Sequence, residues 1–196
     1  MDEAIAETTC QKEVSKTSAL KYRDGLLITL LSLVILRRRA VAALRIGKQL
    51  VKSGDLWALA IPGEDVKGKR PLDFALSRNF SDRIDLYLQK YRPRIPGAKT
   101  HTALWPSNKD GPMTANAIYD TVCKTTKKAF GFSVNPHRFR HAAGALWSIE
   151  DPENVRGVKD LLGHASFEKT TEAHYLTGQT RLAGRALARA IDAATK

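Results

Sequence analysis

The sequence predicts a mainly α-helical α+β domain with one small antiparallel sheet of three strands. A long run with helical periodicity extends from Ala19 to about Arg45. Several short strand-like runs follow it, and the second half of the chain carries helical patterns without strands. A simple helix bundle leaves the strands unexplained, and an alternating α/β fold needs strands in the second half as well.

The first helical run predicts a largely buried helix. Its apolar residues recur at spacings of one, three and four, which is typical of a helix with a wide apolar face. They are Leu26, Leu27, Leu30, Leu31, Val34 and Ile35. Three arginines, 37 to 39, follow directly, and a second helix is predicted to begin between Ala40 and Leu44. Residues 1–18 are polar and predict a leader or an interdomain linker.

Three strands are predicted in the middle of the chain, at Gln49–Val51, Leu56–Ile61 and Pro71–Leu76. A basic turn, Lys67-Gly68-Lys69-Arg70, lies between the last two strands and predicts a charged hairpin.

Further helices are predicted after the sheet, and two or three short ones complete the chain after the helix at His137. The first spans about Asn79 to Tyr91, and Thr114 is the expected N-cap of a helix that ends near Phe130. Asn135-Pro136 predicts another helix start, at His137. The last helix is expected at about residues 179–194.

The charge indicates a polyanionic partner. The 196 residues carry a formal charge of +12, which costs stability through self-repulsion. Nucleic acid is the first candidate, and an anionic membrane surface is the second. The longest apolar stretch, Leu26 to Leu36, is too short to span a bilayer. The two cysteines form no CxxC motif, which fits a reduced cytoplasmic protein better than a zinc ribbon.

Two short segments contain the candidate chemistry. In the first, His137, Arg140 and His141 share one helix face, because they are three and four residues apart. Cations gathered in this way repel each other unless an anion lies among them. A solvated helix end is the plain alternative. Zinc binding by the two histidines is another, although the face carries an arginine and no glutamate.

The second segment is Asp160-Leu161-Leu162-Gly163-His164, with Tyr175 eleven residues after the histidine. By itself it predicts a helix that ends at a glycine, followed by a surface histidine and a half-buried tyrosine.

Together, NPHRFRH and LLGHASFEKTTEAHY closely resemble the second half of the signature of the tyrosine recombinase or phage integrase family. That signature is His-x-x-Arg, then Leu-Gly-His, then a tyrosine about one short helix later. Upstream, Leu36-Arg37 followed by AVAALR is similar to the segment that holds the family's first catalytic arginine. The resemblance covers about residues 20–190 and implies the catalytic-domain fold of these enzymes.

The resemblance implies a role for each matching residue. Tyr175 would be the nucleophile, His164 the second histidine and Lys67 the hairpin lysine, and the remaining three would be Arg37, His137 and Arg140. The chemistry is consistent, because attack on a phosphodiester places charge on the non-bridging oxygens, which guanidinium forks match bidentately. A phenol with an ordinary pKa of ~10 needs activation, for which His137 is a reasonable base. Lys67 would protonate the leaving 5′ oxygen. No metal and no cofactor is expected.

The implied function is site-specific DNA recombination through a covalent 3′-phosphotyrosyl intermediate, without metal or ATP. A DNA-binding remnant without turnover and a type IB topoisomerase-like activity are the alternatives. Ala40 favours the remnant, because the family commonly has an acidic residue there, three positions after the first arginine. The expected DNA-binding surface consists of Arg38, Arg39, Lys69, Arg70, Lys127 and Lys128.

The expected partners are double-stranded DNA and other protomers of a synaptic complex, with no membrane. The C-terminal helix carries an arginine stripe, and it docks either on a neighbouring protomer or on its own domain. Residues 19–196 are expected to form the catalytic domain, and the family's N-terminal core-binding domain is expected to be absent. The resemblance implies a bacterial or phage-encoded protein of the cytoplasm, associated with the nucleoid.

Overall fold

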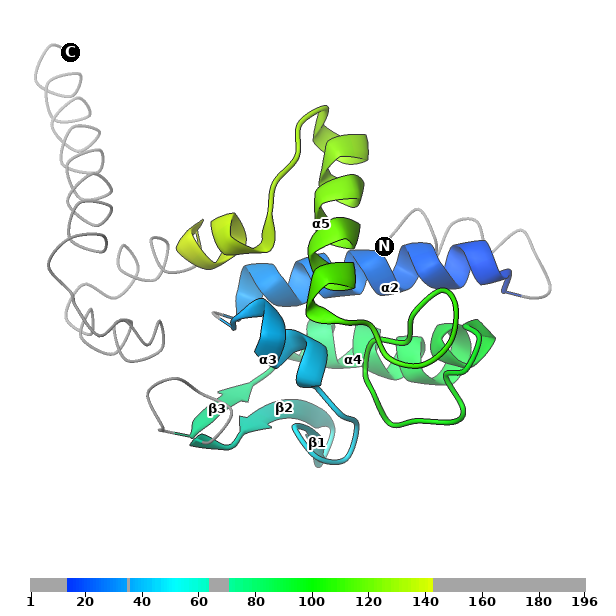
Figure 1. Cartoon of the computed structure of the whole chain (residues 1–196). Coiled ribbons are helices and arrows are strands. Elements are labelled where there is room, and N and C mark those ends of the chain that lie inside the picture. Colours follow the sequence, from blue (N-terminus) through cyan, green and yellow to red (C-terminus); the bar gives the residue numbers. More distant parts are fainter. Residues whose placement is uncertain (1–13, 35, 64–70, 143–196) are drawn as a thin grey trace, which may run out of the picture. The chain divides into compact units, whose positions relative to one another are not determined.

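The computed structural model describes residues 14–34, 36–63 and 71–142, and the described residues up to Arg140 form one compact unit (Figure 1). The predicted fold class is confirmed, since this unit is mainly helical with one three-stranded antiparallel sheet. Its helices are α2 (Lys16–Leu33), α3 (Arg38–Ala43), α4 (Arg78–Leu86) and α5 (Ala115–Phe130), and a further helix occupies residues 136–142. Its strands are β1 (Leu50–Ser53), β2 (Leu56–Ile61) and β3 (Leu72–Ala75). Within the described ranges, no helix has the length and apolar character that crossing a membrane requires.

Helix α2 is the central element of the core. The Ser15 hydroxyl caps it by accepting a hydrogen bond from the Ser18 amide at 3.0 Å, so the helix begins three residues earlier than predicted. Val14 is also buried, and residues 14–18 therefore belong to the fold and not to a leader. Of the apolar residues predicted for this helix, Leu26, Leu27, Leu30 and Leu31 lie within it and face the core.

The predicted second helix is present as α3, but it starts at Arg38, two residues before the predicted range, and α2 already ends at Leu33. Val34 and Arg37 have extended backbones, with ψ angles of 130° and 148°. A β-branched residue lowers helix propensity, and the extended chain buries both Val34 and Leu36. As a result Arg37 lies at the N-cap of α3, where the chain turns.

The sheet has the order β1-β2-β3, with Leu50 opposite Leu59 and Ile61 opposite Leu72. Its three strands lie within a residue or two of the predicted positions. Alternate residues of β2 are buried, namely Trp57, Leu59 and Ile61. The predicted basic hairpin, residues 67–70, lies outside the described residues.

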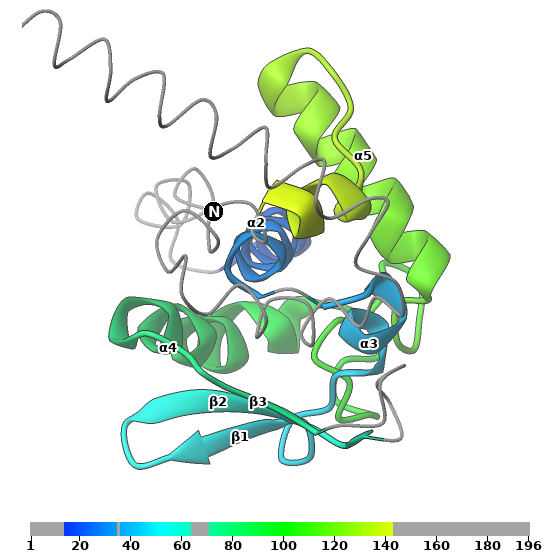
Figure 2. The same cartoon turned by 90° about the vertical axis from the view of Figure 1, so that its left-hand side faces the viewer.

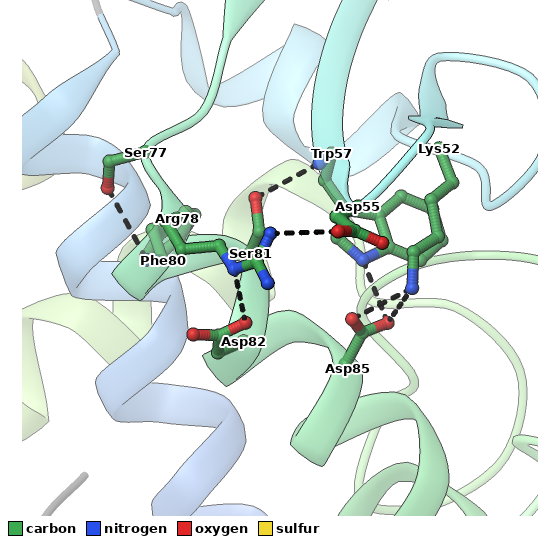
Figure 3. A network of polar contacts seen from close by, with 9 residues as sticks. All are labelled: Lys52, Asp55, Trp57, Ser77, Arg78, Phe80, Ser81, Asp82 and Asp85. Atoms are coloured by element: carbon green, nitrogen blue, oxygen red, sulfur yellow. Dashed lines mark hydrogen bonds and ion pairs between the residues drawn. The ribbon is translucent and has the colours of Figure 1, made fainter.

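Polar contacts join the sheet to α4, which lies against it (Figures 2 and 3). The Trp57 amide donates to the Ser81 hydroxyl at 3.0 Å, and the Trp57 indole N–H donates to the Asp85 carboxylate at 3.0 Å. Lys52 of β1 donates to the same carboxylate at 2.9 Å. These bonds tie β1 and β2 to α4.

An aromatic stack joins α2 to the segment after α4. Tyr22 stacks on Tyr91 with a centroid distance of 4.0 Å, and its hydroxyl donates to the Arg83 carbonyl at 3.0 Å. The predicted helix at 79–91 is α-helical only to Leu86, and a π-helical turn, Tyr87–Tyr91, completes it. This turn places both of its tyrosines against Tyr22.

Helix α5 has the predicted bounds. The Thr114 hydroxyl accepts a hydrogen bond from the Ala117 amide at 3.1 Å, and Gly131 ends the helix with a φ of 80°. The buried Thr126 hydroxyl bonds both backbone groups of Val134, at 2.9 and 3.2 Å. These hydrogen bonds hold the segment after α5 against the helix, just before the helix at residues 136–142 begins.

Candidate active site

A cavity of about 600 Å³ lies where three segments of the described unit meet. One segment is the turn into α3, the second is α5, and the third is the start of the helix at residues 136–142. The lining residues are Leu36, Arg37, Arg38, Arg39, Tyr119, Asn135, Pro136, His137 and Arg140. The cavity therefore contains three of the predicted catalytic residues, which come from two segments far apart in the sequence.

The turn between α2 and α3 carries Arg37 to this cavity. Leu36 is 4% exposed and anchors the turn in the core, while the Arg37 carbonyl accepts the first hydrogen bond of α3, from Val41 at 3.0 Å. The Arg37 side chain is half-buried. Among the three adjacent arginines, Arg37 is thus the one whose backbone is fixed by a buried residue before it and by a helical hydrogen bond at its own carbonyl.

Local capping positions His137 and Arg140. The Asn135 side chain accepts a hydrogen bond from the Arg138 amide at 3.1 Å, and Pro136 is buried in the first turn. The spacing of three residues then places His137 and Arg140 on one helix face. Phe139 packs against the core, as predicted. Arg140 is only 5% exposed, whereas His137 is exposed.

The electrostatics of the cavity favour an anion. Burial and the charge of Arg37 lower the pKa of Arg140 to about 10. Partial burial and the charges of Arg140 and Arg138 lower the pKa of His137. No Asp or Glu is among the described residues that line the cavity. A phosphate group would bring negative charge to these cations, and two guanidinium groups could bind it with bidentate geometry.

Two of the predicted DNA-binding residues, Arg38 and Arg39, also line the cavity and are exposed. The Arg38 guanidinium lies over the ring of Tyr119, 5.7 Å from its centroid. No sequence pattern places Tyr119 at this site, since it is one exposed residue on an amphipathic helix. Only the packing of α3 against α5 brings it to the cavity.

The other predicted residues divide into two groups. Lys127 and Lys128 lie in the last turn of α5, where they are exposed and do not line the cavity. The second group lies outside the described residues and consists of Lys67, Lys69, Arg70, His164, Tyr175 and the C-terminal helix. Within residues 14–34, 36–63 and 71–142, no three His, Cys, Asp or Glu side chains are grouped as a metal ion requires.

Comparisons with known proteins identify the family. The model described as "Phage integrase family" matches residues 5–180, most of the chain. Tyrosine recombinase XerD of Corynebacterium glutamicum is 30% identical over 95 residues, which are 48% of this chain and 31% of that protein. Tyrosine recombinase XerD of Lacticaseibacillus casei is 28% identical over 165 residues, 83% of this chain and 54% of that protein. The chain thus spans about a third to a half of the length of these relatives.

Two solved structures have the same fold. XerH site-specific recombinase, bound to its palindromic difH substrate in a post-cleavage complex, superposes with a TM-score of 0.64 and 21% identity. This superposition covers 94% of the present chain and 49% of XerH. XerA recombinase gives a TM-score of 0.64 at 15% identity, over 87% of this chain and 63% of that one. With this fold and a family model that matches residues 5–180, the chain belongs to the phage integrase family.

Proposed function

We propose that the chain is the catalytic part of a site-specific DNA recombinase that cleaves and rejoins strands through a covalent 3′-phosphotyrosyl intermediate. The observation that carries the proposal is the meeting of Arg37, His137 and Arg140 at one cavity in a member of the phage integrase family. The relatives named tyrosine recombinase support it.

The two arginines would bind the scissile phosphate. As the nucleophile attacks, negative charge grows on the non-bridging oxygens, and preorganised guanidinium groups stabilise it without rearrangement. Arg140 suits this role because its side chain is held in the core and costs little entropy to orient. Charge neutralisation by side chains removes the need for a metal ion at this step.

His137 would act as the general base. Its lowered pKa keeps the imidazole neutral at neutral pH, so the ring can accept the phenolic proton. Tyr175 is the proposed nucleophile, His164 the second histidine and Lys67 the acid for the leaving 5′ oxygen. These three assignments rest on the sequence motif. The phosphotyrosyl ester conserves the energy of the broken bond, so strand rejoining needs no ATP.

Double-stranded DNA is the proposed substrate, and the charge of +12 supports it. XerH, a site-specific recombinase with the same fold, is bound to its palindromic difH substrate in the post-cleavage complex. Arg38, Arg39, Lys69, Arg70, Lys127 and Lys128 are proposed to contact the backbone. We further propose that residues 19–196 belong to the catalytic domain, and that the helix at about 179–194 docks on a neighbouring protomer in a synaptic complex.

The decisive experiment detects the covalent intermediate. The full chain is incubated with nicked suicide duplexes made from the DNA that flanks its gene, with and without EDTA. Protein–DNA adducts that survive denaturant are then separated by electrophoresis. The wild type should form an adduct equally in both conditions, and Tyr175→Phe should form none while it folds and binds duplex normally.

Tyr119→Phe is the matched variant, because Tyr119 is the tyrosine that lines the described cavity. If the adduct is lost in Tyr119→Phe and kept in Tyr175→Phe, the nucleophile is Tyr119. If duplex binding occurs and none of these substrates yields an adduct, the DNA-binding remnant becomes the better description, as Ala40 would suggest. An adduct that needs added magnesium or zinc would overturn the metal-free mechanism.

A further inference from the structure

We propose that Tyr119 is a positioning residue for Arg38, and that Arg38 held over this ring binds a DNA phosphate next to the scissile one. The inference rests on the proposed function and adds to it a residue outside the recombinase motif. It starts from a contact between α3 and α5 at the edge of the cavity.

The contact joins two exposed side chains. Arg38 is the first residue of α3, and its guanidinium lies over the Tyr119 ring at 5.7 Å from the centroid, within the range of a cation–π interaction. Both residues line the cavity together with Arg37 and Arg140. Arg38 therefore lies beside the group that would bind the scissile phosphate.

Tyr119 has no evident role in the core. Its neighbours on α5, Ile118 and Val122, are fully buried, whereas Tyr119 is 39% exposed. The apolar face of the helix is thus complete without this ring. At the edge of a cavity lined by arginines, the electron-rich face of the Tyr119 ring can instead attract a cation.

The Tyr119 ring can hold the Arg38 side chain in place within the arginine triplet. An exposed arginine samples many rotamers, and adjacent arginines repel one another, so an unsupported Arg38 would point away from the cavity for much of the time. A guanidinium over an aromatic face keeps its N–H groups at the edge, where they remain available to phosphate oxygens. Tyr119 would thus order Arg38 before DNA arrives.

A mutant cycle tests the proposal on the full chain. The variants are Tyr119→Phe, Tyr119→Leu, Arg38→Ala and the double variant Tyr119→Leu/Arg38→Ala. A labelled duplex of arbitrary sequence is titrated at several salt concentrations. Thermal unfolding of each variant checks that the fold is intact, which we expect because both side chains are exposed.

Arg38→Ala should reduce the slope of log K against log salt by about 0.9, the value for one phosphate contact. Tyr119→Leu should weaken binding about two- to fivefold, the range expected for an exposed cation–π pair. In the Arg38→Ala background the same leucine should change nothing further. Tyr119→Phe keeps the ring and should preserve most of the affinity.

Three results would overturn the proposal. Tyr119→Leu could weaken binding equally in both backgrounds, which would make the residues independent. Tyr119→Phe could be as weak as Tyr119→Leu, which would make the hydroxyl the contact. Arg38→Ala could leave the salt slope unchanged, which would remove the phosphate contact.

A measurement without DNA separates this proposal from the proposed function. In NMR spectra of the free chain, the Arg38 side-chain protons should carry a ring-current shift that Tyr119→Leu removes and Tyr119→Phe keeps. If the wild type binds no duplex even at low salt, the proposed function and the phosphate contact both fail. The ring-current shift then still decides whether Tyr119 holds Arg38, and its absence in the wild type overturns that part as well.

Discussion

Arg37 and Arg140 line the same cavity, and burial together with the charge of Arg37 lowers the pKa of Arg140 from its ordinary value to about 10. The Arg140 guanidinium therefore binds its proton less tightly in the folded chain than in the unfolded chain. The free energy of unfolding should therefore rise as the pH increases above about 10, and below that pH the cost of holding the two charges together is fully present. At neutral pH both groups are charged, and a bound anion would offset that cost.

Anion binding should accordingly stabilise the protein. Inorganic phosphate at about ten times its Kd should add about 1.4 kcal/mol to the free energy of unfolding, which corresponds to a Tm increase of roughly 3–6 °C. Differential scanning fluorimetry across a phosphate series measures this increase. Arg140→Met should remove most of the response, while Lys99→Gln, a change at an exposed lysine that does not line the cavity, should leave it intact. An equal response in all three proteins would show that phosphate acts elsewhere.

Arg140→Ala should slow adduct formation far more than it weakens duplex binding. The loss of one preorganised donor typically costs about 3–4 kcal/mol of transition-state stabilisation, or ~100- to 1000-fold in rate. Arg140→Lys should recover little of the rate, because an ammonium group lacks the bidentate fork. Single-turnover cleavage rates at saturating protein, compared with separately measured dissociation constants, give the two effects. Equal losses in rate and in binding would make Arg140 an ordinary backbone contact.

The imidazole of His137 should titrate below its ordinary pKa of 6.5 in the free protein, because partial burial and the charges of Arg140 and Arg138 disfavour the imidazolium. Arg140→Met removes one of these charges, so the midpoint should move upward. NMR titration of the ring protons follows both proteins. Since the folded pKa is the lower one, this residue contributes stability above pH 6.5 that is lost as the pH falls through the folded value. If Arg140→Met leaves the titration midpoint of His137 unchanged, the charge of Arg140 does not act on this imidazole.

Duplex binding should be weak, strongly dependent on salt and largely independent of sequence when measured on this chain. Each neutralised phosphate adds about 0.9 to the slope of log K against log salt. The variant Lys127→Gln/Lys128→Gln should lower the slope if the end of α5 contacts the backbone. Lys90→Gln/Lys99→Gln alters two other exposed lysines and serves as the matched control. A flat salt response in the wild type would mean that the net charge serves only solubility.

Several elements were predictable because their determinants are local. Thr114 and Gly131 set both ends of α5 through hydrogen bonding and a left-handed backbone, and Asn135-Pro136 starts the next helix in the same way. The strand-like run Leu56–Ile61, closed by Pro62-Gly63, predicted β2 with its observed bounds. The spacing of His137 and Arg140 likewise decides that they share a face, whatever they pack against.

The position of the break between α2 and α3 was not predictable, because the apolar residues from Leu26 to Leu36 can be buried by a helix or by an extended chain. Burial of Val34 and Leu36 against the rest of the core decides for the extended form. That choice carries Arg37 to the cavity and leaves Arg38 above Tyr119.

The sequence by itself determined the family, the chemical types at the site and the helices that cap themselves, since each depends on residues close together in the chain. The tertiary structure alone decided which side chains share the cavity. Contacts between α3, α5 and the helix at residues 136–142 depend on packing over long sequence separations, and no local pattern encodes them. For the same reason the lowered pKa of Arg140 is a property of the fold, because its causes are burial and a charge from a distant segment.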